Sequence, residues 1–195
     1  ISEGAYGLVV HVKRKSSGKH YAMKVQSKGL MYRYHESVPL DMFNEMHAMT
    51  CFDHPLVMQL SYAFQTSMLA VMTMPLCIYG DLGVLIMNSP NKRVPLPAVK
   101  FYTAEIVSAI IYLHSRGFVY RDLKPANVLI AGDGHVVLTD FGAIADMGRV
   151  VDGCTPFKGD RHSGIINHFS QTEPVVEDDG FTFGTEASLD MTRKA

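Results

Sequence analysis

The stretch Tyr120-Arg121-Asp122-Leu123-Lys124-Pro125-Ala126-Asn127, followed by Asp140-Phe141-Gly142, decides the fold class of this chain. Two acids, a lysine and an asparagine stand at fixed offsets around a predicted hairpin, in which strands over 128–130 and 136–138 flank Ala131-Gly132-Asp133-Gly134. Carboxylate and amide oxygens are ligands that Mg²⁺ prefers, and a carboxylate can take the proton of an attacking hydroxyl. Any one of the four residues could belong to an ordinary turn. All four at this spacing, with strands on both sides, favour a phosphate-handling site.

The bulk composition limits the class of protein. Of the 195 residues, 47% are hydrophobic, which indicates a globular chain long enough for one good core or two small lobes. The formal net charge of −1 gives no electrostatic argument for nucleic acid. The longest apolar stretch, 68–79, is broken by Thr73 and Pro75 and falls short of the roughly 20 residues that span a bilayer. We therefore expect a cytoplasmic protein with no nucleic-acid partner and no transmembrane segment.

Hydrophobic periodicity predicts an α+β protein in two parts. Apolar alternation predicts strands over 5–13, 20–26, 58–64 and 69–73, and steps of three and four predict helices over 41–51 and 97–116. Residues 75–80 indicate a linker, and residues 146–195 are rich in Gly, Asp, Ser and Thr and are predicted to be mostly irregular. We expect an N-terminal lobe over 1–76 and a partial C-terminal lobe over 77–195.

A lysine and a glutamate of the N-terminal lobe are predicted to pair. Lys24 follows the apolar residues of a strand and, taken alone, could simply reach solvent. Glu45, however, lies between Met42 and Met49 on the inner stripe of the predicted helix. A carboxylate among methionines needs a cation partner, because burying an unpaired charge is costly.

Two glycines stand in Ser2-Glu3-Gly4-Ala5-Tyr6-Gly7-Leu8-Val9, on a predicted strand–turn–strand. Glycine lets backbone N–H groups approach phosphate oxygens, since no Cβ is in the way. A glycine pair alone is weak support, because most such pairs merely close hairpins.

Taken in order from residue 2 to residue 142, these motifs resemble those of the eukaryotic protein-kinase superfamily. Lys124-Pro125-Ala126-Asn127 resembles the serine/threonine branch. Tyr120 in place of the usual histidine, with His54-Pro55-Leu56-Val57, is similar to the AGC group, and Tyr62-Ala63-Phe64 to its G-protein-coupled receptor kinases. The resemblance implies a bilobal kinase fold that transfers phosphate from ATP, with Mg²⁺, to a serine or threonine of a protein substrate.

The resemblance also implies a role for each residue of the site. Asp122 would be the catalytic base and Lys124 would steady the transferring phosphate, while Asn127 and Asp140 would hold Mg²⁺. Nucleotide contacts would come from the glycine-rich loop, the Lys24–Glu45 pair, the linker and the walls of the adenine site: Ser2, Glu3, Gly4, Ala5, Gly7, Val9, Ala22, Lys24, Glu45, Met72 or Met74, Asp81 and Leu129. Asp81 has an alternative role as an acid at the N-terminus of a helix. A stack of side chains would join the lobes: Met49, Leu60, Tyr120 and Phe141.

Several departures from the family pattern favour a second interpretation. Ser2 stands where the first glycine is usual, and Ala143 follows Asp140-Phe141-Gly142 where a larger residue is usual. No Ala-Pro-Glu follows within the chain, so we expect an incomplete catalytic domain, inactive on its own under either hypothesis. An ATP-binding pseudokinase or scaffold is the main alternative, and a small-molecule phosphotransferase of related fold is the third. Candidate phosphorylation sites lie in the tail: Thr155, Ser188 and Thr192.

Overall fold

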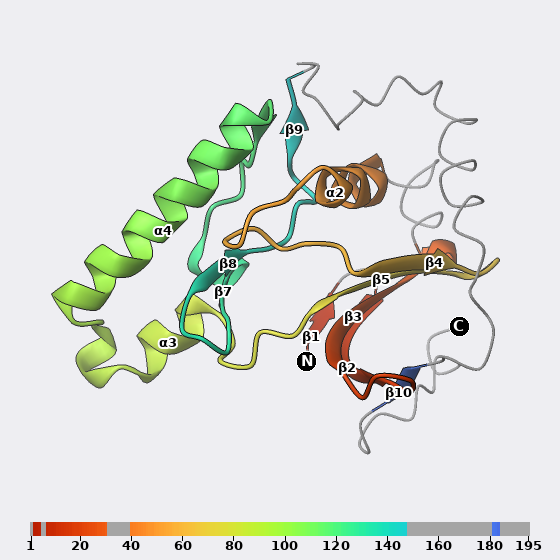
Figure 1. Ribbon diagram of the computed structural model, residues 1–195, viewed down its shortest axis with the longest axis horizontal. Coiled ribbons are helices and arrows are strands. Elements are labelled where there is room, and N and C mark those ends of the chain that lie inside the picture. The colour runs from red at the N-terminus through yellow and green to blue at the C-terminus, as the bar shows by residue number, and fades with distance from the viewer. Residues whose placement is uncertain (1, 5–6, 31–39, 148–180, 184–195) are drawn as a thin grey trace.

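The alternating segments near the N-terminus form an antiparallel sheet in a computed structural model, which describes residues 2–4, 7–30, 40–147 and 181–183 (Figure 1). The sheet follows the order β1-β2-β3-β5-β4, and β10 also pairs with β2. Its strands are β1 (Ser2–Gly4), β2 (Gly7–Arg14), β3 (His20–Ser27), β4 (Tyr62–Gln65), β5 (Leu69–Pro75) and β10 (Phe181–Phe183).

The two faces of this sheet have different partners, because successive side chains of a strand point to opposite sides. One face carries Ala22, Met72 and Met74, which join the main core of the protein. The other face has its own apolar cluster: Val10, Val12, Tyr21, Met23, Val25 and Val71. Helix α2 (Leu40–Thr50) covers the first face, and its buried Met46 and Met49 belong to the same main core (Figure 1). The functional residues of β3 therefore point toward α2.

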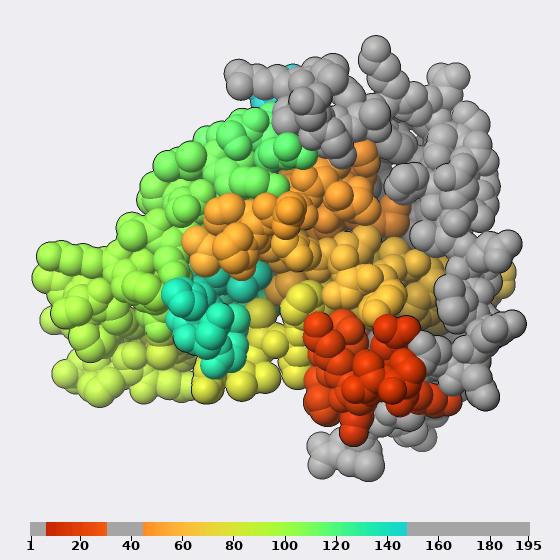
Figure 2. Space-filling view, viewed as in Figure 1, coloured from red at the N-terminus to blue at the C-terminus, as the bar shows by residue number. Residues whose placement is uncertain are grey.

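The second lobe consists of two helices and short strands. Its elements are α3 (Leu82–Asn88), η1 (Pro90–Lys92), α4 (Leu96–Ser115), β6 (Phe118–Val119), η2 (Pro125–Asn127), β7 (Val128–Ile130), β8 (Val136–Leu138) and β9 (Ala145–Asp146). Helix α4 ends at Ser115, and Gly117, which follows the C-cap residue Arg116, has a φ of +81°, a left-handed conformation that few other residues adopt. Figure 2 shows the N-terminal strands (red) and this lobe (green to teal) on either side of the linker (yellow).

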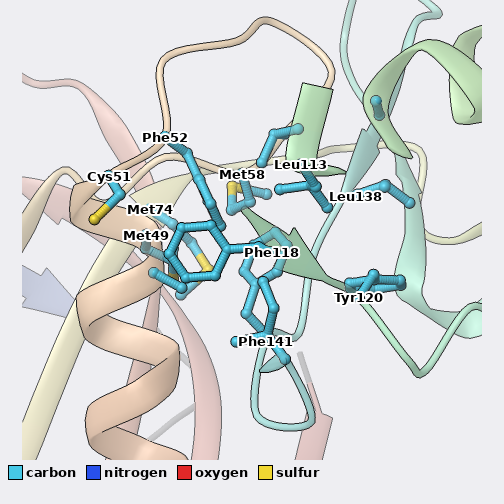
Figure 3. Packing of buried hydrophobic residues seen from close by; sticks show 14 of the residues in the cluster. Met49, Cys51, Phe52, Met58, Met74, Leu113, Phe118, Tyr120, Leu138 and Phe141 are labelled. Carbon is cyan, nitrogen blue, oxygen red and sulfur yellow. The ribbon is translucent and has the colours of Figure 1, made fainter. Parts of the chain in front are cut away.

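One continuous core joins the two lobes. The ring of Phe52, which follows α2, packs edge-on against Phe118 at 5.3 Å and Phe141 at 5.1 Å between centroids (Figure 3). A few residues further on, the N–H of Met58 donates to the carbonyl of Leu138 at 2.8 Å. The segment after α2 thus holds β8, and with it the hairpin that follows the predicted catalytic loop over 120–127, in a defined place relative to the sheet.

The structure confirms the expected α+β bilobal fold, with strand and helix bounds within a few residues of those predicted for most elements. It differs in three places. Residues 82–88 form α3, and Phe118–Val119 pairs with Ala145–Asp146 as a small second sheet. The tail, predicted to be mostly irregular, also contains the strand Phe181–Phe183, which pairs antiparallel with β2 of the N-terminal lobe. The candidate phosphorylation sites Thr155, Ser188 and Thr192 lie outside the described residues.

Among the described helices, α4 alone has the length and apolar composition of a membrane-crossing helix, with a mean hydropathy of 1.4 over its best 18-residue window. It contacts β6 and β8, and its Ala109 and Leu113 are fully buried in the core shared by both lobes. Helices that pack on water-soluble cores share this composition, so the expected lack of a transmembrane segment stays a prediction.

Candidate active site

The predicted ion pair of the N-terminal lobe is formed. Nζ of Lys24 on β3 lies 2.6 Å from Oε2 and 2.7 Å from Oε1 of Glu45 on α2. The glutamate side chain is only 5% exposed. Burial raises the pKa of Glu45, and the ammonium of Lys24 opposes that rise. The negative charge of Asp140 in the other lobe also raises it.

In the predicted catalytic loop, two of the predicted residues donate hydrogen bonds to the carboxylate of a third, Asp122. Oδ2 of Asp122 accepts hydrogen bonds from Nζ of Lys124 at 2.7 Å and from Nδ2 of Asn127 at 2.9 Å. Nδ2 of Asn127 also donates to the backbone carbonyl of Asp122 at 3.0 Å. Asn127 is buried, whereas Asp122 and Lys124 reach solvent. The two hydrogen bonds therefore fix the orientation of the Asp122 carboxylate and leave it accessible to solvent.

The charges in this loop support a proton acceptor at neutral pH. The hydrogen bond from Lys124 lowers the pKa of Asp122, and Asn127 adds to the effect. The same contact raises the pKa of Lys124. Because both shifts favour the charged forms, an ionised carboxylate and a protonated ammonium stand side by side.

The two predicted metal ligands are joined through the backbone. The N–H of Thr139, the residue before Asp140, donates to the carbonyl of Asn127 at 3.0 Å. Since the amide nitrogen of Asn127 is engaged by Asp122, its Oδ1 is the acceptor left for a cation. An amide oxygen and a carboxylate match the hard-oxygen preference of Mg²⁺. No group of three His, Cys, Asp or Glu side chains forms a metal cluster in the described part of the chain.

Two site residues have an unusual backbone. Arg121 and Asp140 have φ of +65° and +60°, a left-handed conformation that non-glycine residues rarely adopt. Nε of Arg121 donates to the carbonyl of Ala143 at 2.6 Å, and Nη2 to that of Ile144 at 3.4 Å. Strained positions persist where their surroundings over-determine them, and they concentrate at functional sites. This guanidinium contact escaped prediction because it joins residues 22 positions apart.

Two of the four side chains of the predicted stack, Tyr120 and Phe141, are in direct contact. The buried rings of Tyr120 and Phe141 meet edge-on at 5.7 Å between centroids (Figure 3). The hydroxyl of Tyr120 donates to the carbonyl of Thr139 at 2.5 Å, and burial raises the pKa of this phenol. Met49 is buried in the same core, and Leu60 is partly buried and packs against that core. Phe52, which the sequence analysis did not single out, supplies the additional ring against Phe141.

The predicted walls of the adenine site lie on the core face of the sheet and on the hairpin. Ala22 is buried in the main core, and Val9 and Leu129 are partly buried and pack against that core. In the β3–β5 register, Met72 is opposite Lys24 and Met74 is opposite Ala22. Both methionines therefore share the face of Lys24, and Met74 is the one next to the linker.

Gly7 has a structural role that the phosphate argument did not include. A Cβ at this position would stand 1.9 Å from the backbone oxygen of Val25 on β3. Only glycine lets the two strands approach this closely. Of the rest of the loop, the structure describes the backbone of Ser2, Glu3 and Gly4, which pairs with β2, while Ala5 lies outside the described residues.

Asp81 takes the alternative role. Its Oδ1 accepts the N–H of Val84 at 2.9 Å, which caps the N-terminus of α3. Its backbone also bridges to Leu129 of the hairpin. The contact to a ribose stays a prediction.

The site as a whole combines an ion pair between Lys24 and the buried Glu45 with a loop that carries a carboxylate, a lysine and an asparagine, the combination that the resemblance to protein kinases implied. The family model described as protein kinase domain matches residues 1–162. The chain belongs to the protein kinase domain family.

Curated relatives agree with this placement. Serine/threonine-protein kinase AtPK1/AtPK6 of Arabidopsis thaliana is 41% identical over 143 residues, which cover 73% of this chain and 30% of the relative. Serine/threonine-protein kinase Sgk3 of Rattus norvegicus is 38% identical over 159 residues, 82% of this chain and 32% of the relative. Protein kinase 2 of Dictyostelium discoideum is 36% identical over 159 residues, which cover 82% of this chain and 32% of the relative. The chain thus spans about a third of the length of these relatives.

Proposed function

We propose that this chain carries the ATP- and Mg²⁺-binding and proton-accepting parts of a serine/threonine protein kinase. The observation that carries the proposal is the arrangement around Asp122, whose carboxylate is oriented by Lys124 and Asn127 beside the strand that leads to Asp140. The names of the relatives, serine/threonine-protein kinases, support the class of acceptor.

Each residue would contribute positioning or charge, since phosphoryl transfer needs little covalent help. Asp122 would accept the proton of a substrate serine or threonine hydroxyl while that oxygen attacks the terminal phosphorus of ATP, and the bond between that phosphorus and the bridging oxygen breaks to release ADP. Lys124 would neutralise charge on the transferred group, and Lys24, held by Glu45, would orient the other two phosphates. Mg²⁺, when bound through Asn127 and Asp140, supplies positive charge next to the phosphate oxygens.

An ATP-binding pseudokinase is the second candidate, favoured by Ala143 after the Asp140-Phe141-Gly142 motif. The side chain of Ala143 is exposed and contributes no packing, although its carbonyl holds Arg121. This candidate keeps the nucleotide site and omits turnover.

Transfer of labelled phosphate separates the two candidates. The full-length protein is incubated with γ-labelled ATP and Mg²⁺, with and without a serine-containing peptide, while thermal unfolding records nucleotide binding. A kinase transfers label and is stabilised by ATP with Mg²⁺. Stabilisation without transfer would favour the pseudokinase.

A further inference from the structure

The outer edge of β8, which faces away from β7, has two different partners. The N–H of Leu138, at its end, donates to the backbone oxygen of Leu56 at 2.9 Å. The N–H of Val136, at its start, donates to Oε2 of Glu105 on α4 at 3.0 Å. Alternate N–H groups of a strand point to the same side, so the Glu105 carboxylate continues the pairing where the backbone partner has ended.

The other oxygen of the same carboxylate is also engaged. Oε1 of Glu105 lies 2.5 Å from Nδ1 of His135, and the glutamate side chain is 13% exposed against 52% for the histidine. A largely buried carboxylate needs such partners. The ring of Phe101, one turn earlier on α4, lies 5.6 Å from that of His135. We call Glu105 with its contacts to His135 and Val136 the hairpin clamp.

The clamp lies at the closed end of a hairpin whose open end carries both predicted metal ligands. Asn127 comes directly before β7, and Asp140 comes two residues after Leu138. The strands have three residues each, and so short a hairpin is marginal without outside contacts. A slip of β8 by one residue would move Asp140 by about 3.3 Å. That exceeds a whole Mg²⁺–oxygen distance of about 2.1 Å.

We propose that Glu105 is a positioning residue for the magnesium site, because it holds the start of β8 in register so that Asp140 and Asn127 face the same cation. The inference rests on the proposed function. Glu105 acts through Val136 and His135 and touches neither nucleotide nor metal.

Nucleotide titrations with and without metal test the proposal. Binding of a fluorescent ATP analogue is measured in Mg²⁺ and in a chelator for wild type, Glu105→Ala, Glu105→Gln and the exposed α4 control Lys100→Ala. Glu105→Ala is expected to reduce the Mg²⁺-dependent gain in affinity about tenfold. Affinity without metal should not change, because Lys24 and Glu45 lie in the other lobe. Glu105→Gln keeps an acceptor for Val136 but loses the ion pair to His135, so it should lose at most about threefold of the gain, and Lys100→Ala should retain all of it.

Two outcomes would overturn the proposal: an unchanged gain in Glu105→Ala, or equal losses with and without Mg²⁺. Amide exchange adds a readout independent of ligand, since the Val136 N–H should exchange faster in Glu105→Ala than in Glu105→Gln. Should Glu105→Ala unfold, His135→Ala provides the second arm. His135→Ala should lose about threefold of the Mg²⁺-dependent gain, which is the contribution of one exposed ion pair. If His135→Ala loses none of the gain, the result contradicts the clamp.

The result is separable from that of the proposed function. A full-length protein that binds nucleotide with Mg²⁺ and fails to transfer phosphate contradicts the transferase and leaves the clamp standing. A wild-type chain without any Mg²⁺-dependent gain contradicts both.

Discussion

Both carboxylate oxygens of Glu45 hold the single ammonium group of Lys24, at 2.6 and 2.7 Å. This contact joins β3 to α2 across the core face of the sheet, where the register places Met72 opposite Lys24. The N-terminal lobe thus presents a fixed cation toward the lobe that carries Asp140. We therefore expect nucleotide binding to depend on this pair as well as on the loop that carries Asp122.

Replacing Lys24 by Met should remove nucleotide binding and destabilise the fold. The loss leaves Glu45 buried without a cation, which costs about 3 kcal/mol of unfolding free energy. Denaturant unfolding measures the stability, and fluorescence titration measures the affinity for ATP.

The matched controls are Lys15→Met, an exposed turn lysine, and the double variant Lys24→Met with Glu45→Leu. The double variant should regain most of the stability and none of the affinity, because an apolar pair of similar size replaces a buried ion pair well. A single variant as stable as wild type would show that the pair is not structural.

Most of the site was predictable because its contacts are local or repeat along a helix. Asn127 reaches Asp122 within one loop, and the stripe of α2 turns Glu45 toward the core. The hairpin followed from a glycine turn between two apolar runs. These features depend on spacing within a short segment.

The rest required tertiary contacts that no local pattern encodes. None of the residues of helix α3 is buried, and its apolar sequence shows no stripe that would predict a helix. Its N-terminus is capped by Asp81. Strands β6 and β9 are two residues long and meet from distant parts of the chain. Glu105 and His135 are 30 positions apart, and only the packing of α4 on β8 brings them together.

Substituting Gly7 by Ala should destabilise the sheet. The new Cβ would stand 1.9 Å from the Val25 oxygen, which is backbone and cannot rotate away. Separating β2 from β3 at that point should cost about 2 kcal/mol, typical of overpacking. Gly29→Ala is the control, since its nearest neighbour would be 3.8 Å away. Equal melting temperatures for the two variants would contradict the close approach.

The contribution of His135 to stability should depend on pH. Its hydrogen bond to Glu105 raises the pKa of His135 in the folded protein above the ordinary value of about 6.5. The charged pair therefore contributes fully below about pH 6.5, and the contribution is lost as pH rises through the folded pKa. The melting temperature of wild type should exceed that of His135→Ala most at about pH 5.5 and least at about pH 9. A gap that stays constant or widens with pH would show that the imidazole is not paired as a cation.

The central claim is that Asp122 accepts the proton during phosphate transfer. The most direct test compares wild type with Asp122→Asn in the full-length protein, measuring both phosphate transfer to a serine peptide and the dissociation constant of ATP with Mg²⁺. The account predicts that Asp122→Asn lowers the transfer rate by about a thousandfold, the middle of the range for general-base catalysis, while nucleotide affinity stays within about twofold of wild type. Transfer that persists at the wild-type rate in Asp122→Asn would contradict it.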